Sequence, residues 1–169
     1  MSLVKYISGE KFPTLISVSG GVTVEVGDLL FLDNTSGLRD DGGSTASSKA
    51  YPLKYFRLSG SSLELNRSGV PNYFVGVALS DKAGKTGSSD FNINVATEGV
   101  FEFPLKPGRT VYVGNFASAS GTTTSSNLFN QYVKRTTDIN YALGIFVENK
   151  TSALNAFVSI CSILSPRRL

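Results

Sequence analysis

The chain has 169 residues, with 16 lysines and arginines against 13 aspartates and glutamates, a net charge of +3 and no histidine. This length predicts a single domain that can bury an ordinary hydrophobic core without disulfides or metals. The absence of histidine excludes Ser-His-Asp triads, imidazole zinc sites and histidine general bases from this chain. Abundant Gly, Ser, Thr, Val and Phe favour strands joined by turns, and no long run shows apolar residues at helical spacing.

Residues 1–12, MSLVKYISGEKF, are expected to form an arm or a first strand that ends at Pro13. Charges interrupt the apolar residues, so this segment lacks the core of a signal peptide. No run in the chain approaches the about 18 apolar residues of a membrane span, so no membrane partner is expected. The arm is expected to dock on this domain or on a neighbour through its apolar side chains, Leu3, Tyr6, Ile7 and Phe12.

A single β domain is expected from residue 13 to residue 169. Its first strands are expected at residues 15–18, 22–26 and 29–32. The third of these is continuously apolar, which is typical of a strand that is buried on both faces.

Two polar, glycine-rich segments are expected to be long loops: residues 34–49, NTSGLRDDGGSTASSK, and residues 117–127, ASASGTTTSSN. Such segments bury too little apolar surface to offset their ordering entropy, so we expect them to be mobile unless a partner orders them. Long loops in compact domains are often functional, and these are therefore candidates for intermolecular contacts. The residues selected for that role are Leu38, Arg39, Thr122 and Thr123.

Residues 51–58 and 62–66 are expected to form a hairpin about Gly60-Ser61, with Leu63 and Leu65 both pointing inward.

A β-meander is expected next, formed by residues 74–79, 91–96 and 100–103. The alternation of apolar and polar residues in the second of these runs is typical of a strand with one buried and one solvated face.

The last part of the chain is expected to contain further strands. Pro104 and Pro107 are expected to interrupt the meander, which restarts at Val111. Residues 128–134 fit either a strand or a helical turn. The segments expected to complete the fold are residues 141–147 and 156–164.

The order of these elements occurs twice, which indicates an internal pseudo-repeat. We interpret the chain as two similar β units, roughly residues 22–96 and 100–163, in one antiparallel barrel or sandwich. The matched segments are 75–82 with 143–150, 27–34 with 108–115, 22–26 with 100–103 and, less closely, 91–95 with 157–161.

No catalytic site, cofactor or metal is expected. Cys161 lies in an apolar run and is expected to be a small buried side chain, since a thiol nucleophile normally needs a histidine. The carboxylates Asp40-Asp41 lie in a soft loop that would not hold them at the fixed separation that a glycosidase needs. The Glu25/Asp28 cluster lies at a strand end, where a turn-forming aspartate is expected. Nothing resembles a P-loop, a dinucleotide fingerprint or an EF-hand.

Nucleic-acid binding is an alternative, because OB-like barrels bind single strands with aromatic platforms in a basic groove. In this chain the basic residues are scattered along the sequence. Most of the aromatic residues occupy alternating strand positions that a core would use. We therefore expect no nucleic-acid partner.

Three segments resemble the small β-rich capsid decoration, or cement, proteins of tailed bacteriophages. They are F-V-G-V-A-L-S-D-K-A-G at 74–84, I-N-V-A-T-E-G-V-F-E-F-P at 93–104 and G-R-T-V-Y-V-G-N at 108–115. The segments V-G-D-L-L-F-L at 26–32 and L-G-I-F-V-E-N-K at 143–150 fit the same pattern. The resemblance extends over roughly residues 22–163, and residues 34–49 with the following hairpin look like an insertion relative to the shortest members.

This resemblance implies a structural protein of the virion without enzymatic activity. Such proteins sit as homotrimers on the outer surface of the assembled head, at three-fold or quasi-three-fold positions. There they stabilise the lattice of the major capsid protein, after synthesis in the host cytoplasm. A tail, fibre or other surface-binding β module is the first alternative, and the OB-like single-strand binder is the second.

Overall fold

The computed structural model describes residues 4–9, 13–40, 45–58, 62–81 and 89–164. Within these ranges the fold is all-β, as the composition predicts. The strands are β1 Lys5–Ser8, β2 Pro13–Val18, β3 Leu29–Asp33, β4 Lys49–Pro52, β5 Phe74–Ala78, β6 Phe91–Ala96, β7 Glu98–Val111, β8 Phe116–Gly121, β9 Leu128–Thr136, β10 Gly144–Phe146 and β11 Lys150–Cys161. The helices are η1 Leu53–Tyr55, α1 Leu63–Gly69, η2 Val70–Asn72 and η3 Ile139–Tyr141.

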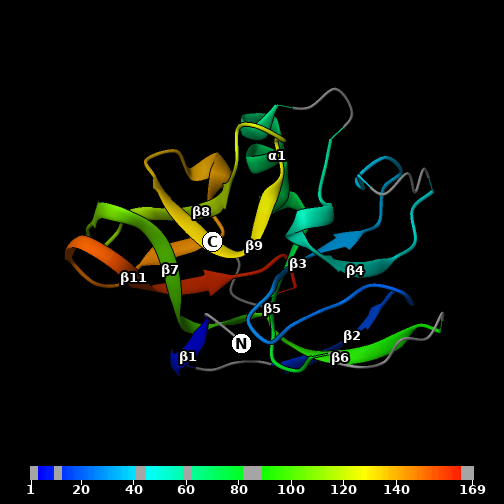
Figure 1. Cartoon of the computed structure of the whole chain (residues 1–169). Coiled ribbons are helices and arrows are strands. Elements are labelled where there is room, and N and C mark those ends of the chain that lie inside the picture. Colours follow the sequence, from blue (N-terminus) through cyan, green and yellow to red (C-terminus); the bar gives the residue numbers. More distant parts are fainter. Residues whose placement is uncertain (1–3, 10–12, 41–44, 59–61, 82–88, 165–169) are drawn as a thin grey trace.

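The strands form a closed barrel with the order β2-β4-β3-β5-β6 and a six-stranded sheet with the order β1-β7-β11-β10-β8-β9 (Figure 1). All neighbours pair antiparallel except β2 and β4, which meet in parallel at Val18 and Ala50. Residues 13–96 supply every strand of the barrel, whereas residues 98–161 supply every strand of the sheet except β1.

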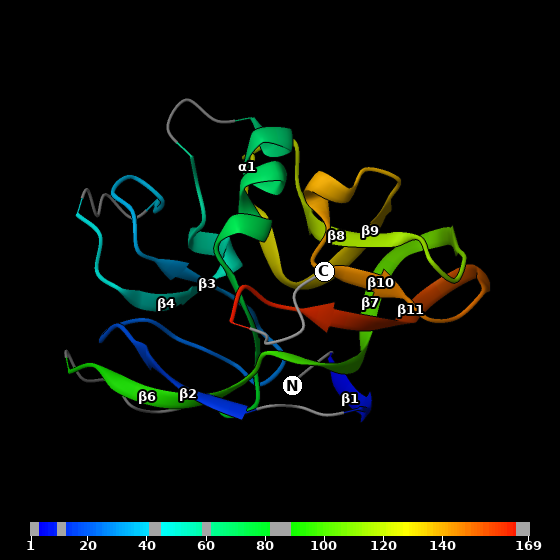
Figure 2. The same ribbon diagram turned by 180° about the vertical axis from the view of Figure 1, so that it is seen from behind.

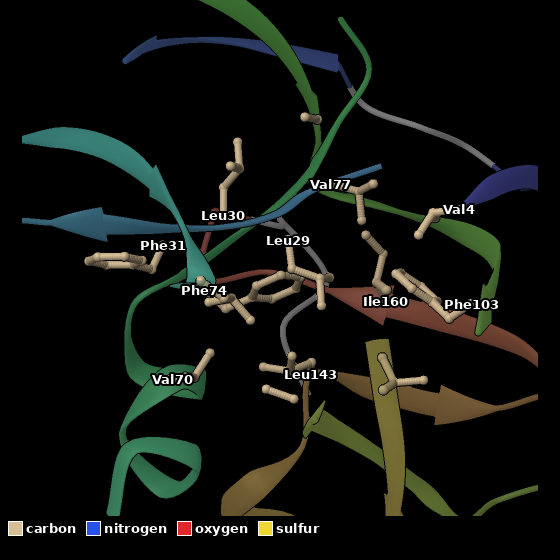
Figure 3. Packing of buried hydrophobic residues seen from close by; sticks show 14 of the residues in the cluster. Val4, Leu29, Leu30, Phe31, Val70, Phe74, Val77, Phe103, Leu143 and Ile160 are labelled. Atoms are coloured by element: carbon tan, nitrogen blue, oxygen red, sulfur yellow. The ribbon is translucent and has the colours of Figure 1, made fainter. Parts of the chain in front are cut away.

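One continuous hydrophobic cluster includes side chains of both the barrel and the sheet. Figure 3 shows Leu29 and Phe74 of the barrel beside Leu143 and Ile160 from the sheet half of the chain. Near the end of the described chain, the Ile163 N–H donates to the Phe74 carbonyl oxygen at 2.9 Å. The two strand systems therefore share one core.

The predicted hairpin of residues 51–66 is wrong. Its first strand, β4, ends at Pro52 and is followed by η1, and residues 63–69 form the helix α1 (Figure 2). The Ser62 hydroxyl accepts a hydrogen bond from the Leu65 N–H at 3.3 Å and so caps the helix. Leu63 is buried as predicted, but Leu65 faces solvent because successive odd residues diverge on a helix. Ser62, followed by an acidic residue in the first turn, is a helix-start signal that the strand prediction did not use.

The predicted loop at residues 117–127 is also wrong in its first half, where β8 lies between β9 and β10. The four residues 117–120, Ala-Ser-Ala-Ser, are all buried. A strand that is buried on both faces does not alternate in polarity, and its small side chains permit close packing. A Cβ atom at Gly121 would lie 2.4 Å from the Asn127 carbonyl oxygen.

The expected break at Pro104 and Pro107 does not occur, since β7 continues from Glu98 to Val111. Its pairing with β11 is irregular here: Pro104 faces Asn155, whereas Arg109 faces Ala153. The extra residues of β7 form a bulge, where a missing proline N–H is tolerated.

Three further expectations differ from the structure or are decided by it. Residues 22–26 form no hydrogen-bonded strand, although Val22 and Val24 are buried as in a strand. Residues 128–134 belong to the strand β9 rather than to a helical turn. The Cys161 side chain is half-buried rather than fully buried.

The hairpins β5–β6 and β10–β11 each contain the same kind of close contact between a glycine and the backbone of the paired strand. A Cβ atom at Gly76 would lie 2.0 Å from the Ala96 carbonyl oxygen, and one at Gly144 would lie 2.2 Å from the Ser159 carbonyl oxygen. The sequence comparison aligns these two glycines.

The turns that precede β3 and β8 also share their contacts, but not in the predicted register. The Gly27 N–H donates to the Ala78 carbonyl at 2.8 Å, and the Gly114 N–H donates to the Phe146 carbonyl at 3.0 Å. The contact that Gly27 makes is thus made by Gly114, whereas the sequence comparison matched Gly27 with Gly108. The aligned segments are V-E-V-G-D at 24–28 and V-Y-V-G-N at 111–115.

The third predicted match is likewise shifted. Val95 pairs with Ala78 of β5, and Val158 pairs with Phe146 of β10. By pairing position Val95 therefore corresponds to Val158, whereas the sequence comparison aligned it with Cys161.

Candidate interaction surfaces

Part of the predicted amino-terminal arm forms the edge strand β1 of the sheet. Tyr6 pairs with Phe101 of β7, and the two rings meet edge to face with centroids 5.5 Å apart. Val4 is buried, whereas Ile7 remains 40% exposed. Residues 4–9 therefore dock on this chain, and among the described residues β1 is an edge strand of the sheet. The candidate residues Leu3 and Phe12 lie outside the described residues.

Leu38 and Arg39 connect the 34–49 segment to the barrel. The Leu38 side chain is buried in the core, so it presents no surface in this conformation. The Arg39 guanidinium lies 4.7 Å above the Tyr51 ring and 3.5 Å from the Asp33 carboxylate. The Ser47 hydroxyl also donates to Asp33, at 2.8 Å. These contacts fix both sides of the segment, and residues 41–44 lie outside the described residues.

Thr122 and Thr123 lie in the turn between β8 and β9. The Thr122 N–H donates to the Asn127 carbonyl at 2.9 Å, and the Thr123 side chain is exposed. The Asn66 amide of α1 donates to the Ser126 carbonyl of the same turn. Both views place this turn beside α1 at the end of the molecule opposite β1 (Figures 1 and 2). The predicted residues therefore do not form one surface.

A group of exposed apolar side chains, which we name the apolar tip, lies at the far end of the sheet. Its members Tyr112, Val113 and Val147 are 53%, 60% and 41% exposed. The Val113 N–H donates to the Asn149 side chain at 2.8 Å, which joins the β7–β8 turn to the β10–β11 hairpin. Figure 1 shows these two turns next to each other at the left of the molecule.

The sequence analysis missed the apolar tip because it assigned Tyr112 and Val113 to a strand. The Asn115 N–H donates to the Tyr112 carbonyl oxygen at 3.0 Å, and the Tyr112 N–H donates to the Asn115 side chain at 3.3 Å. This β-turn leaves the Tyr112 and Val113 side chains exposed. The Gly114-Asn115 pair is the signal that could have located the turn. Arg135 lies beside the tip, with its guanidinium 5.8 Å from the centre of the Tyr112 ring.

The Glu25/Asp28 cluster lines a cavity of about 350 Å³ together with Lys54 and residues of β9. Asp28 is almost fully buried. One of its carboxylate oxygens accepts from the Gln131 amide at 2.9 Å, and the other accepts from the Glu25 N–H at 3.0 Å and the Asn130 amide at 3.4 Å. Asp28 therefore holds the turn before β3 against β9.

Burial raises the pKa of Asp28, while hydrogen bonds from the Glu25 N–H and from Gln131 act in the opposite direction. The folded state thus holds the Asp28 proton more tightly than the unfolded state. Stability from this group is present below the unfolded pKa of 3.8 and is lost as the pH rises through the raised folded pKa.

We expect Asp28→Asn to remove this pH dependence, because Asn115 makes the same turn contact in the second half without a charge. The free energy of unfolding of the variant, minus that of the wild type, should increase as the pH rises above about 4. Denaturant titrations at a series of pH values measure this difference. Asp28→Ala is the comparison, and loss of its acceptors should cost about 1–3 kcal/mol. A difference between Asp28→Asn and wild type that is constant with pH would contradict the assignment.

The described residues contain no group of three or more His, Cys, Asp or Glu side chains that could hold a metal ion. No helix in the described part of the chain has the length and apolar character needed to cross a membrane. No protein-family model matches the chain, and the comparison with curated proteins gives no match either.

Proposed function

We propose that this protein is a capsid decoration protein of a tailed bacteriophage. It binds the outer surface of the assembled head as a homotrimer and stabilises the lattice of the major capsid protein. The motifs at residues 74–84, 93–104 and 108–115 suggest the family. The structural observation that best supports a surface-binding role is the apolar tip, formed by Tyr112, Val113 and Val147.

The apolar tip has the properties of a small protein-binding surface. Burial of a valine side chain contributes roughly 1.5–3 kcal/mol, and tyrosine and arginine are enriched at the centres of interfaces. Tyr112 and Arg135 lie together at the edge of the tip. The tip belongs to two turns that hydrogen bonds hold on the sheet, so little ordering entropy would oppose its binding.

Trimerisation explains how so small a surface could hold a capsid lattice. Three linked copies bind with an affinity far above that of one copy, provided that all three engage together. The exposed side chain of Ile7, on the edge strand β1, is a second candidate for contacts between copies or with the shell. A decoration protein needs this combination of a stable body and repeated weak contacts.

The test is binding of the purified protein to heads that lack it. The triple variant Tyr112→Ser/Val113→Ser/Val147→Ser should reduce co-sedimentation with heads at least about tenfold, since it removes the apolar surface but no core residue. Light scattering should report a trimer for the wild type.

The matched control replaces exposed leucines elsewhere. Leu15→Ser and Leu65→Ser alter side chains that are 67% and 52% exposed, on β2 and α1, and should leave binding unchanged. Equal binding by the triple variant and the wild type would refute the role of the apolar tip. A wild type that binds no heads at all would refute the decoration function.

Single-strand nucleic-acid binding has one feature in its favour, the closed five-stranded barrel. Its large aromatic side chains are core residues, however, and base stacking requires exposed rings. These buried rings are Phe31, Tyr51, Phe56 and Phe74. Oligonucleotide binding that falls steeply with salt would favour this alternative over the decoration function.

A further inference from the structure

A second cavity, of about 450 Å³, lies between α1 and the strands β7, β8 and β9. Its volume is within the roughly 300–1,000 Å³ that is usual for small-molecule sites. Five of the side chains that line it are cationic. They are Arg67, Lys106, Arg109, Lys134 and Arg135, and we name them the basic cavity.

Arg67 is the buried member of the basic cavity. Its Nε atom donates to the Ala119 carbonyl oxygen of β8 at 3.2 Å, and its Nη1 atom donates to the Glu64 carboxylate. These bonds fix the guanidinium group at the junction of α1 and β8. A buried cation is costly unless anions neutralise it, so the position of Arg67 favours negative charge in this cavity.

The negative charge that the chain itself supplies to the basic cavity is small. Glu64 pairs with Arg67 and lies 3.7 Å from Lys134 Nζ, but its side chain is 58% exposed. Among the described residues, the side chains of Lys106 and Arg109 form no hydrogen bond or ion pair. Among the described residues, one largely solvated carboxylate therefore pairs with only two of the five cations, Arg67 and Lys134.

The behaviour of Lys134 shows that these charges are close together. Burial lowers the pKa of Lys134, the charge of Arg67 lowers it further, Glu64 raises it, and Arg109 lowers it again. Cations that disfavour one another in this way gain when an anion binds among them.

We propose that the basic cavity binds a diphosphate group, either as inorganic pyrophosphate or as part of a small phosphate ester. Arginine forks match phosphate oxygens in pairs, and lysines add flexible point charges. Arg67 and Arg109 are placed to bind from the α1 and β7 sides, and Arg135 from β9. The bound anion links these elements and stabilises the fold. This site is independent of the proposed capsid function.

Calorimetric titration of pyrophosphate into the folded chain tests the proposal, at about 0.15 M ionic strength to suppress non-specific attraction. The wild type should bind one pyrophosphate per chain, and its melting temperature should rise by about 2–4 °C or more. Lys106→Gln/Arg109→Gln should weaken binding at least about tenfold, because both side chains are exposed and the fold does not depend on them.

The control double variant Lys49→Gln/Arg57→Gln has the same net charge. It removes cations that pair with Asp90 and Asp40 on the barrel side, and it should bind pyrophosphate like the wild type. Glu64→Gln should bind several-fold more tightly, since it removes the competing carboxylate. If Lys106, Arg109 and Glu64 had a purely structural role, their substitution would not change the affinity for pyrophosphate in opposite directions.

Adenosine diphosphate distinguishes the two sources of the diphosphate. Affinity equal to that of pyrophosphate indicates recognition of the phosphates alone, and tighter binding indicates a nucleotide ester. The proposal is overturned by any of three results: no saturable pyrophosphate binding, equal losses in the two double variants, or weaker binding by Glu64→Gln. Binding of an acidic peptide or an oligonucleotide without pyrophosphate binding would also overturn it.

Discussion

Gly76→Ala is expected to destabilise the protein by about 3–5 kcal/mol, and Gly144→Ala by about 2–4 kcal/mol. The added methyl group would lie 2.0 Å from the Ala96 carbonyl oxygen in the first case and 2.2 Å from the Ser159 carbonyl oxygen in the second. Both obstacles are backbone atoms of the paired strand, so a side-chain rotation cannot relieve them. Gly76 has the larger expected effect because its φ of +137° also strains any other residue.

The control for these variants is Gly21→Ala. Gly21 has a φ of +78°, but its added Cβ atom would meet nothing within 4 Å. The Gly21→Ala variant therefore measures only the free-energy cost of placing alanine in a positive-φ backbone conformation, about 1–2 kcal/mol. Equilibrium denaturation of the three variants gives the comparison. If Gly144→Ala were no more destabilising than Gly21→Ala, the close approach of β10 and β11 would be incorrect.

The two glycines also show which of the predicted segment matches have the same backbone contact. Gly76 and Gly144 align by sequence because a close strand contact allows no other residue. The upstream match failed because Gly27 and Gly108 were aligned by their position before a strand. The decisive feature was the β-turn before each strand, in which the side chain of its last residue, Asp28 or Asn115, accepts from the N–H three residues earlier. The segment V-x-V-G followed by Asp or Asn identifies that turn.

The strand predictions succeeded where one face of a strand is buried and the other is solvated. In β6, Ile93 and Val95 are buried, and Asn92 and Asn94 are exposed. The alternation fails for β8, because Ser118 and Ser120 are buried beside alanines in a crowded central strand. Sequence polarity reports contact with water, and it misleads when small polar side chains are used for close packing.

The candidate site was less predictable than the fold. Leu38 was selected because its loop is polar, yet Leu38 itself packs in the core. The apolar tip and the basic cavity each combine residues that are distant in sequence, such as Val113 with Val147 and Arg67 with Arg109. Their proximity depends on the order β7-β11-β10-β8-β9, which no local pattern in the sequence specifies.

The two surfaces are adjacent in the structure, and this affects how variants should be interpreted. Arg135 lines the basic cavity and also lies over the Tyr112 ring at the apolar tip. Its Nη1 atom donates to the Thr110 carbonyl at 3.3 Å, on the β7 segment between them. A change at Arg135 would alter both surfaces, so Lys106 and Arg109 are better probes of the cavity, and Val147 is a better probe of the tip.

Asn66→Ala is expected to destabilise the protein by about 2–4 kcal/mol, a large effect for one polar side chain. Asn66 has no exposed surface. Its Oδ1 atom accepts from the Leu58 N–H at 2.9 Å, and its Nδ2 atom donates to the Ser126 carbonyl oxygen at 2.9 Å. Alanine would leave both backbone groups without this partner, and its higher helix propensity offsets only about 0.7 kcal/mol or less.

Leu65→Ala on the same helix is the matched control, because Leu65 is 52% exposed and its loss should change stability by no more than about 0.5 kcal/mol. Asn66→Asp separates the two hydrogen bonds. A carboxylate can still accept from the Leu58 N–H, but only a protonated carboxyl group can donate to Ser126. The deficit of Asn66→Asp relative to wild type should therefore shrink as the pH falls, whereas that of Asn66→Ala should not. If the deficit of Asn66→Asp relative to wild type were the same at all pH values, the hydrogen bond to Ser126 that links α1 to the β8–β9 turn would contribute nothing to stability.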